Sequence, residues 1–222
     1  MPLVTTLLRL DVHPLIAPQL WDAVTEYGST RADGLTVVVN VADGPGNGRD
    51  PSYTAATDRL AAAGVTLLGY VDLRFATRPV ARVLADVDRW AGYPVQGVFL
   101  DRAPSTPYAI GPAAVAVSSA RRAGFGRTVL NPGLVPDPIY RDLGATICVF
   151  DGDWRRYLRW DGAGCEPGDG HLIHSVPPAE SDDAWLLQAV RHAGFGMVTD
   201  LAPPREYAGL PAWLTAATPV PV

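Results

Sequence analysis

Cysteine, clustered positive charge and long apolar runs are all scarce in this chain of 222 residues. The two cysteines, Cys148 and Cys165, stand in no metal-ligand spacing, so we expect no metal. The net charge is −5, and no Lys or Arg cluster alternates with aromatic residues, which argues against nucleic acid as a partner. No apolar stretch approaches the roughly 20 residues that a membrane-spanning helix needs, so we expect no membrane partner either.

The start of the chain, MPLVTTLLRLDVHP, also lacks the features of a secretory signal peptide. It has no basic opening, no long apolar stretch and no small-residue cleavage site. Arg9 and Asp11 interrupt its apolar run, which favours a first strand. Together with the few cysteines, this pattern predicts a cytoplasmic protein.

Apolar runs of strand length alternate with longer helical patterns, which is typical of a parallel sheet with crossover helices. Eight strand-like runs follow one another: residues 5–12, LTVVVN, VTLLGYVD, VQGVFLD, RTVLNPG, ATICVFDG, HLIHSV and FGMVTD. We therefore predict a single (β/α)8 barrel over residues 1–222, with a frayed Pro-rich tail at 216–222. The alternative is an open doubly wound sheet, but its phosphate fingerprint G-x-G-x-x-G is absent.

Each of the eight predicted strands ends in polar or ionisable residues. These are Asp11 with His13, Asn40, Tyr70 with Asp72, Asp101, Asn131, Asp151, His174, and Thr199 with Asp200. The carboxyl ends of barrel strands meet at one mouth, where barrel enzymes carry their active sites. A single Asp after a strand is also a common turn former or helix cap, but eight converging positions are harder to explain that way.

Two of these residues, Asp101 and Asp151, have the positions that glycosidic cleavage requires. One carboxyl group donates a proton to the leaving oxygen, and the other attacks carbon or activates water. The two residues end the fourth and sixth strands, which places them on one arc of the mouth. We expect their carboxyl groups to lie about 5 to 10 Å apart, a span that includes both retaining and inverting geometries.

At these motifs the chain resembles the spherulin-4 (spherulation-specific) family. The matching segments, in family order, are VVVNVADGPG, DPSYTAATDRLAAAGV, LLGYVD, VQGVFLD, VLNPG, VFDGDW, HLIHSVP and GFGMVTD. Fungal members of this family include secreted hydrolases of galactosamine-containing polysaccharide. The resemblance implies a glycoside-hydrolase-like barrel with catalytic carboxylates at Asp101 and Asp151.

The chain departs from the family pattern inside the expected site. The family usually has Asp-Glu after strand four and Glu-Gly after strand six, whereas this chain has Asp101-Arg102 and Asp151-Gly152. Arg102 either pairs with a neighbouring acid or contacts an anionic ligand. The family's Tyr-Tyr-Pro-like ending of the first strand is also replaced, here by DVHP.

The remaining polar residues at the mouth are candidates for binding the substrate. We assign this role to Asp11, His13, Asn40, Tyr70, Asp72, Arg102, Asn131, Trp154, His174 and Asp200. Each has a structural alternative, such as a rim histidine with satisfied hydrogen bonds or an asparagine that braces a loop. Tyr70, Trp154, Tyr157 and Trp160 could form a surface for stacking sugars, but packing of a helix on the barrel explains the last three equally well.

Three functions remain open from the sequence. The first is a glycosidase-like hydrolase of amino-sugar oligosaccharides or polysaccharides that needs no cofactor. The second is a cytoplasmic isomerase, cyclase or lyase that moves protons on a small metabolite, with Asp and His as acid and base. The third is a non-catalytic carbohydrate-binding relative. The fold cannot decide among them, because this barrel supports many chemistries.

Overall fold

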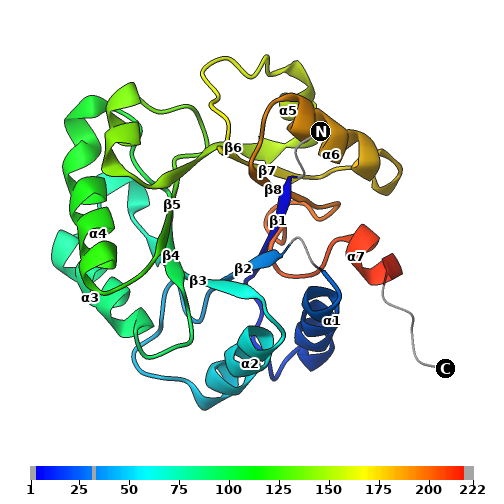
Figure 1. Ribbon diagram of the computed structural model, residues 1–222, viewed down its shortest axis with the longest axis horizontal. Helices are drawn as coiled ribbons and strands as arrows, with labels where there is room; N and C mark the ends of the chain where they lie inside the picture. Colours follow the sequence, from blue (N-terminus) through cyan, green and yellow to red (C-terminus); the bar gives the residue numbers. More distant parts are fainter. Residues whose placement is uncertain (1–3, 32–33, 218–222) are drawn as a thin grey trace.

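In the computed structural model, which describes residues 4–31 and 34–217, eight parallel strands close into a barrel in the order β1 to β8 (Figure 1). The strands are β1 Thr5–Leu10, β2 Leu35–Val39, β3 Thr66–Asp72, β4 Gly97–Asp101, β5 Arg127–Asn131, β6 Thr146–Asp153, β7 Gly170–His174 and β8 Phe195–Val198. The pairing of β1 with β8 closes the ring. The predicted barrel is therefore confirmed, and the open sheet is wrong.

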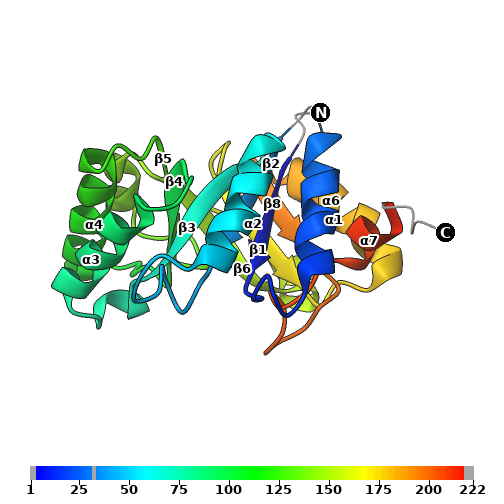
Figure 2. The same cartoon turned by 90° about the horizontal axis from the view of Figure 1, so that it is seen from below.

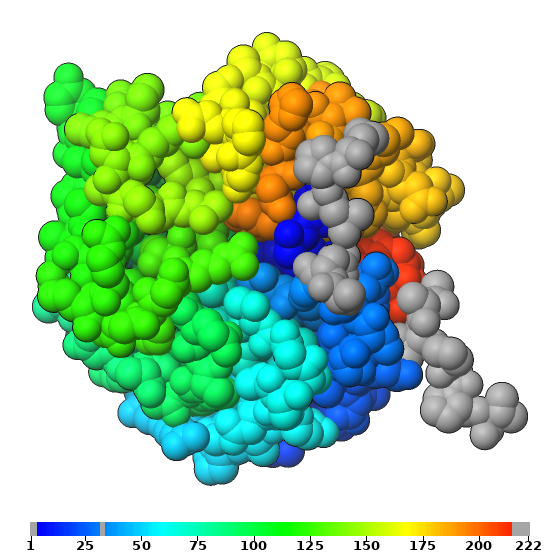
Figure 3. Space-filling view, viewed as in Figure 1, coloured from blue at the N-terminus to red at the C-terminus, as the bar shows by residue number. Residues whose placement is uncertain are grey.

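The helices surround this ring. The α-helices are α1 Pro18–Ser29, α2 Pro51–Ala62, α3 Val80–Trp90, α4 Ile110–Arg122, α5 Trp154–Arg159, α6 Ser181–Val190 and α7 Ala212–Ala217. Short 3₁₀ helices are η1 Arg74–Ala76, η2 Pro107–Ala109, η3 Pro138–Leu143 and η4 Pro178–Glu180. In the space-filling view, the colours follow the sequence around the ring, so successive units lie side by side (Figure 3).

Local signals in the sequence explain where individual helices begin and end. Before α2, the Asp50 carboxylate accepts hydrogen bonds from the backbone N–H groups of Ser52 and Tyr53, and Pro51 occupies the first helical turn. After α2, Gly64 takes a positive φ of 82°, which a glycine adopts without steric cost. Of the tail at 216–222, the last five residues lie outside the described part of the chain.

Alternation along the strands divides the core into two layers. The interior of the barrel is filled by Leu7, Val38, Leu68, Tyr70, Phe99, Val129, Cys148, Leu172, Phe195 and Met197. The outward residues of the same strands pack against helices, where Trp21 and Trp90 are fully buried. Because side chains alternate with a period of two, the next inward position beyond the interior layer opens into the mouth. Arg9, Asp101 and Asn131 occupy such positions.

Strand β6 breaks this alternation with a bulge. Its register against β7 shifts between Cys148 and Phe150, so one extra residue stands in β6. Val149 and Phe150 consequently both pack outside the barrel, while Cys148 lies in its interior. Asp151 then pairs in register with inward-facing Leu172 and points into the mouth. Bulges of this kind re-aim side chains next to active sites.

The segment between β8 and α7 covers part of the mouth. Figure 2 shows it in orange, extending beyond the strands at one end of the barrel. It is tied to the end of β1, because the backbone N–H of Asp11 donates to the carbonyl of Tyr207 at 3.0 Å. Among the described residues, no helix is both long enough and apolar enough to cross a membrane.

Candidate active site

A cleft of about 860 Å³ opens at the carboxyl ends of the strands. Seven of the twelve residues predicted from the sequence line it: Asp11, Tyr70, Asp101, Arg102, Asn131, Asp151 and His174. They come from strands spread around the ring, as a barrel mouth requires. The cleft is large enough to hold more than one sugar ring, since ligand pockets commonly measure about 300–1,000 Å³.

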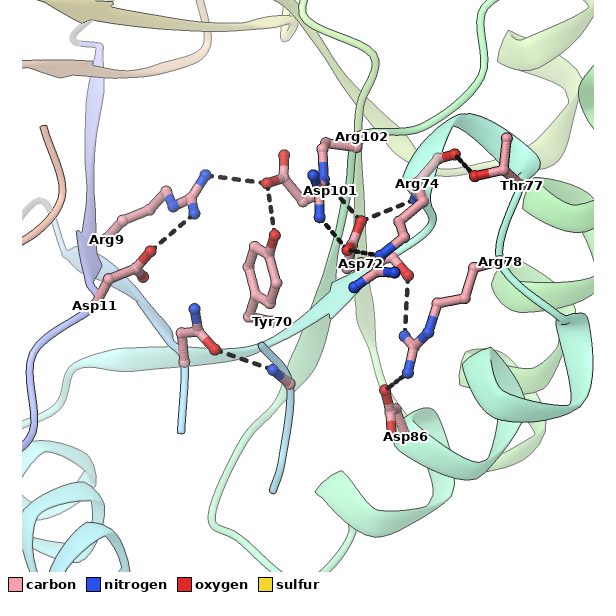
Figure 4. A network of polar contacts seen from close by, with 12 residues as sticks. Arg9, Asp11, Tyr70, Asp72, Arg74, Thr77, Arg78, Asp86, Asp101 and Arg102 are labelled. Carbon is pink, nitrogen blue, oxygen red and sulfur yellow. Dashed lines mark hydrogen bonds and ion pairs between the residues drawn. The ribbon is translucent and has the colours of Figure 1, made fainter. Parts of the chain in front are cut away.

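Asp101 lies at the floor of the cleft and is almost fully buried, with 6% of the residue exposed. Its Oδ2 accepts hydrogen bonds from Arg9 Nη1 at 3.2 Å and from the Tyr70 hydroxyl at 3.0 Å (Figure 4). Its Oδ1 accepts from Asn131 Nδ2 at 2.8 Å. Three donors, one of them cationic, therefore face this carboxylate and stabilise its negative charge.

Asn131 joins the two candidate catalytic residues. Its amide nitrogen donates to Asp151 Oδ2 at 2.7 Å as well as to Asp101, which uses both of its hydrogens. Its carbonyl oxygen accepts from the backbone N–H of Gly133 at 3.1 Å, which fixes the orientation of the amide. The other oxygen of Asp151 accepts from the Tyr207 hydroxyl at 2.9 Å.

The surroundings of Asp151 differ from those of Asp101 in charge. No cation donates a hydrogen bond to the Asp151 side chain among the described residues. Burial raises the pKa of this carboxyl group above its usual value, and the nearby charge of Asp101 raises it further. The hydrogen bonds from Asn131 and Tyr207 only partly oppose this shift. Asp151 therefore holds a proton more readily than an aspartate in water does.

Arg9 is the cation at the centre of the site. Its side chain is buried between Asp101 and Asp11, with Nη2 donating to Asp11 Oδ2 at 3.1 Å. The guanidinium carbon lies 3.7 Å from the centroid of the Tyr207 ring, a close cation–π contact. Burial alone would lower the pKa of Arg9, but the charges of Asp101 and Asp11 raise it instead. Burial also raises the pKa of Asp11, which Arg9 partly offsets.

Asp72 belongs to a neighbouring ion network and does not line the main cleft. It faces a smaller cavity of about 240 Å³ that is rich in arginine. Arg102 donates to both of its oxygens, and Arg74 donates through its backbone N–H at 2.8 Å and its Nε at 3.1 Å (Figure 4). These hydrogen bonds, from Arg102 first and then Arg74, lower the pKa of Asp72 although burial alone would raise it.

The turn after β3 has a rare backbone conformation. Three consecutive non-glycine residues, Arg74, Phe75 and Ala76, have φ values of 45°, 52° and 67°. Arg102, which follows β4, is also left-handed, with φ of 48°. This conformation costs roughly 1–2 kcal/mol for each residue that carries a Cβ. Such strain persists only where the surrounding contacts impose it, and it concentrates at functional sites.

The structure does not bring five of the predicted binding residues to the cleft, and Asp72 is one of them. His13 Nδ1 accepts from the backbone N–H of Leu15, and Asn40 Oδ1 accepts from that of Gly44. Both residues brace loops. Asp200 accepts from the backbone N–H of Ala212 at 2.7 Å and so caps α7.

Trp154 is the fifth residue outside the cleft. It is buried on the outer side of the barrel, where its ring stacks on Tyr157 and its indole N–H donates to Glu180. Trp160 packs against Phe150 in the same region. The aromatic stripe is therefore a contact between α5 and the barrel, which was the structural alternative for these residues.

Several cleft residues are not among the predicted site residues. Arg9, Phe75, Arg156, Glu206 and Tyr207 all line the cleft. A signal existed for Arg9, a lone charge within an otherwise apolar strand. Tyr207 lies in a loop that has no periodic pattern, so the sequence does not predict that its side chain reaches the cleft. Within the part of the chain that the structure describes, no three His, Cys, Asp or Glu side chains could hold a metal ion together.

Known proteins resemble this chain in sequence and in structure. Spherulin-4 of Physarum polycephalum is 34% identical over 149 residues, which cover 65% of this chain but only 44% of that protein. The crystal structure of Aspergillus clavatus Sph3 in complex with GalNAc (N-acetylgalactosamine) superposes with a TM-score of 0.83 at 27% identity, covering 97% of this chain and 96% of Sph3. Proteus mirabilis N-acetylneuraminate lyase, with a TM-score of 0.50 at 14% identity over 90% of this chain and 71% of the lyase, shares the fold alone.

The model of spherulation-specific family 4 matches residues 7–219, nearly the whole chain. This match covers β1 from Leu7 onward, the other seven strands, and every residue of the carboxylate pair and its donors. The chain therefore belongs to spherulation-specific family 4.

Proposed function

We propose that this protein is a retaining glycoside hydrolase acting on amino-sugar oligosaccharides or polysaccharides of the galactosamine type. The observation that carries the proposal is the shared amide of Asn131, which holds Asp101 and Asp151 at the floor of an open cleft. The substrate class is supported by the GalNAc bound to Aspergillus clavatus Sph3.

The spacing of the two carboxyl groups favours retention of the sugar's configuration. One oxygen of each carboxyl group accepts a hydrogen bond from the same nitrogen, at 2.8 and 2.7 Å, so these two oxygens are at most about 5.5 Å apart. Retaining enzymes hold their carboxyl groups about 5–5.5 Å apart, whereas inverting enzymes need about 6.5–9.5 Å to admit a water molecule.

The surroundings of the two residues support a different role for each. Asp101, which faces Arg9 and two neutral donors, is the nucleophile, because its charge is stabilised in place. Asp151, whose pKa burial raises, is the general acid and base. Environments that separate the pKa values of two neighbouring carboxyl groups are how one site provides both functions.

The reaction then proceeds in two displacements. Asp151 gives its proton to the glycosidic oxygen while an Asp101 oxygen attacks C1, so the C1–O bond breaks and a glycosyl ester forms. Asp151, now a carboxylate, removes a proton from water as the water oxygen attacks C1. The ester bond breaks, Asp101 leaves as a carboxylate, and Asp151 is protonated for the next cycle.

The test is direct. The natural protein is incubated with α-linked galactosamine and N-acetylgalactosamine oligosaccharides, and shorter products and their anomeric configuration are followed by NMR. We expect cleavage with retention. Products of inverted configuration would refute the two roles, and no product from a folded protein at high concentration would refute the substrate class.

A non-catalytic carbohydrate-binding protein is the second candidate, and Arg102 is the observation that favours it. This cation stands where the family usually has a second acid, and it lines the cleft. Binding of the same oligosaccharides without any cleavage would establish this candidate. For the isomerase, cyclase or lyase hypothesis, His13 braces a loop outside the cleft, and His174 is the candidate histidine that lines it.

A further inference from the structure

We propose that Phe75 is a sugar-stacking residue, which a left-handed turn clamped by the Asp72–Arg102 ion pair holds at the cleft. The inference rests on the proposed function, because it assigns a binding surface and a sugar configuration to that same site. Phe75 is not among the site residues predicted from the sequence.

Phe75 exposes an apolar ring to solvent, which does not stabilise the folded protein. The residue is 58% exposed and lines the main cleft together with Asp101 and Asp151. Exposed apolar groups inside a polar cleft mark a surface that a ligand covers. The remaining lining residues are largely polar or charged, so Phe75 supplies the main aromatic face that is free to be covered.

The backbone beneath Phe75 makes this exposure a built feature. Phe75 is the middle of three consecutive left-handed residues, and no glycine relieves the turn. A relaxed turn would be cheaper to form, so the contacts around it must impose the conformation. Its N–H donates to the carbonyl oxygen of Arg102 at 2.6 Å, which ties the turn to the end of β4.

The clamp is the Asp72 carboxylate, which is 2% exposed. It accepts hydrogen bonds from Arg74 on one side of Phe75 and from Arg102 on the neighbouring strand. Figure 4 shows both arginines pointing at this carboxylate from opposite elements. Arg78 also binds the residue that precedes the turn, because its Nη1 donates to the Asp72 carbonyl oxygen at 3.0 Å. Arg102 is thus a positioning residue that acts through the turn.

The chemistry of the ring indicates which sugar it recognises. In a galacto-configured pyranose, the axial hydroxyl at C4 leaves the C–H bonds at C3, C4 and C5 together on one face. These C–H bonds carry partial positive charge and pack on the negative face of an aromatic ring. A gluco-configured sugar has no equally continuous apolar face. Stacking on Phe75 therefore favours galacto over gluco configuration.

The experiment measures affinity by calorimetry in an Asp151→Asn background, which prevents cleavage of the probes. The probes are α-linked N-acetylgalactosamine oligosaccharides and N-acetylglucosamine oligosaccharides of the same length. Phe75→Ala should weaken binding of the galacto probe about tenfold and leave the gluco probe nearly unchanged, while Phe75→Trp restores the preference. The matched control is Tyr108→Ala, which removes an aromatic ring that is 99% exposed away from the cleft.

A second measurement needs no ligand. Arg102→Ala should speed amide hydrogen exchange over residues 73–77 and weaken the galacto probe as Phe75→Ala does, with Arg102→Lys intermediate. If Phe75→Ala binds the galacto probe as tightly as its parent, the stacking role is wrong while the proposed function stands. If the Asp151→Asn parent binds neither probe, both the stacking role of Phe75 and the proposed substrate class are wrong. Unchanged exchange in Arg102→Ala would overturn the clamp.

Discussion

Asp72 and Asp101 are neighbours in register on β3 and β4, both are nearly buried, and both are bound by an arginine. Their surroundings nevertheless give them different roles. Both Asp72 oxygens accept hydrogen bonds from Arg74, in the left-handed turn after β3, and from Arg102, which follows β4, so this carboxylate holds the backbone. Asp101 opens into the cleft and shares a donor with a second acid. Position at a strand end therefore does not distinguish a candidate catalytic carboxylate from a structural one, whereas the donors around it do.

Substitution by asparagine should separate the structural aspartate, Asp72, from the two proposed catalytic ones most clearly. Asp101→Asn and, separately, Asp151→Asn should each lower kcat by about 10³-fold or more, because an amide is neither a nucleophile nor a proton donor of the required strength. Asp151→Asn should melt close to the natural protein, whereas Asp101→Asn also removes a charged partner of the buried Arg9 and should be less stable. Asp72→Asn should lose stability but keep the chemical step. Rates of oligosaccharide cleavage and thermal unfolding together check this, and a full loss of kcat in Asp72→Asn would contradict it.

Arg9→Met tests how far the site around Asp101 depends on its buried arginine. Removing one partner from a buried ion pair costs roughly 3–5 kcal/mol, so the free energy of unfolding should fall by that amount at neutral pH. Without Arg9, the already raised pKa of Asp11 rises further. A carboxyl group with a raised pKa loses its contribution to stability as pH rises through that value, so the deficit should grow as pH rises from the ordinary range of an aspartate through the raised pKa of Asp11.

Urea unfolding at several pH values measures this deficit. Arg82→Met is the matched control, since it removes an exposed arginine remote from Asp101 and should change stability by no more than about 0.5 kcal/mol. A deficit that shrinks with rising pH would refute the electrostatic explanation.

Arg102→Glu sharpens the comparison by restoring the family's usual acid. It places a carboxylate against buried Asp72 and removes the hydrogen bonds that Arg102 donates. Because Arg102 is about half exposed, we expect a loss of only about 1–3 kcal/mol. Lowering the pH should recover part of it by protonating one of the paired acids. Chemical denaturation measures the loss, and a gain in hydrolysis without loss of stability would mean that residue 102 is catalytic.

Asn131→Ala removes the donor that Asp101 and Asp151 share. The pKa of Asp151, already raised by burial and by the charge of Asp101, should rise further, because the hydrogen bond from Asn131 lowers it. Because the general acid must be protonated, activity falls as pH rises through this pKa, so the alkaline limb of kcat/KM should move to higher pH. Profiles of the natural protein and the variant test this. A limb that moves downward would exclude Asp151 as the acid.

Chelation should have the smallest effect. The proposed mechanism uses two carboxyl groups and water, so EDTA should leave the rate of cleavage unchanged. The rate after dialysis against EDTA, and again after a divalent metal ion is added, is the measurement. Loss of the cleavage rate on chelation and its recovery with the metal ion would refute the proposed mechanism.

The sequence was a good guide to the fold, because the physical signals for it are local. Eight apolar runs, each followed by a turn or helix pattern, correspond to the strands β1 to β8. Alternation with a period of two also predicts that Asp101 and Asn131 share the mouth. The helical segment that follows the fifth strand is the 3₁₀ helix η3. Its type depends on how residues 138–143 pack, which the pattern does not contain.

The sequence was a weaker guide to which strand-end residues act. Asp72, Asp101 and Asp200 look alike in the sequence, but their donors come from residues distant along the chain or from a later helix. Trp154 has the spacing of a binding stripe, and only its burial against β6 identifies it as packing. Tyr207 reaches Asp151 across 56 positions of sequence, a contact that no local pattern encodes.

The bulge in β6 decides which side of the barrel wall Asp151 occupies. Strict alternation from Cys148 would turn Val149 outward, Phe150 inward and Asp151 outward, which would place a phenyl ring at the floor of the cleft and a carboxylate in an apolar contact. The bulge instead places Val149 and Phe150 on the same side, so Asp151 faces the cleft. Deleting Val149 would remove the bulge and leave Asp151 facing inward, whereas straightening the strand with Val149 in place would keep the barrel and lose the pair. An irregularity of one residue in the backbone thus decides whether this mouth can carry two acids.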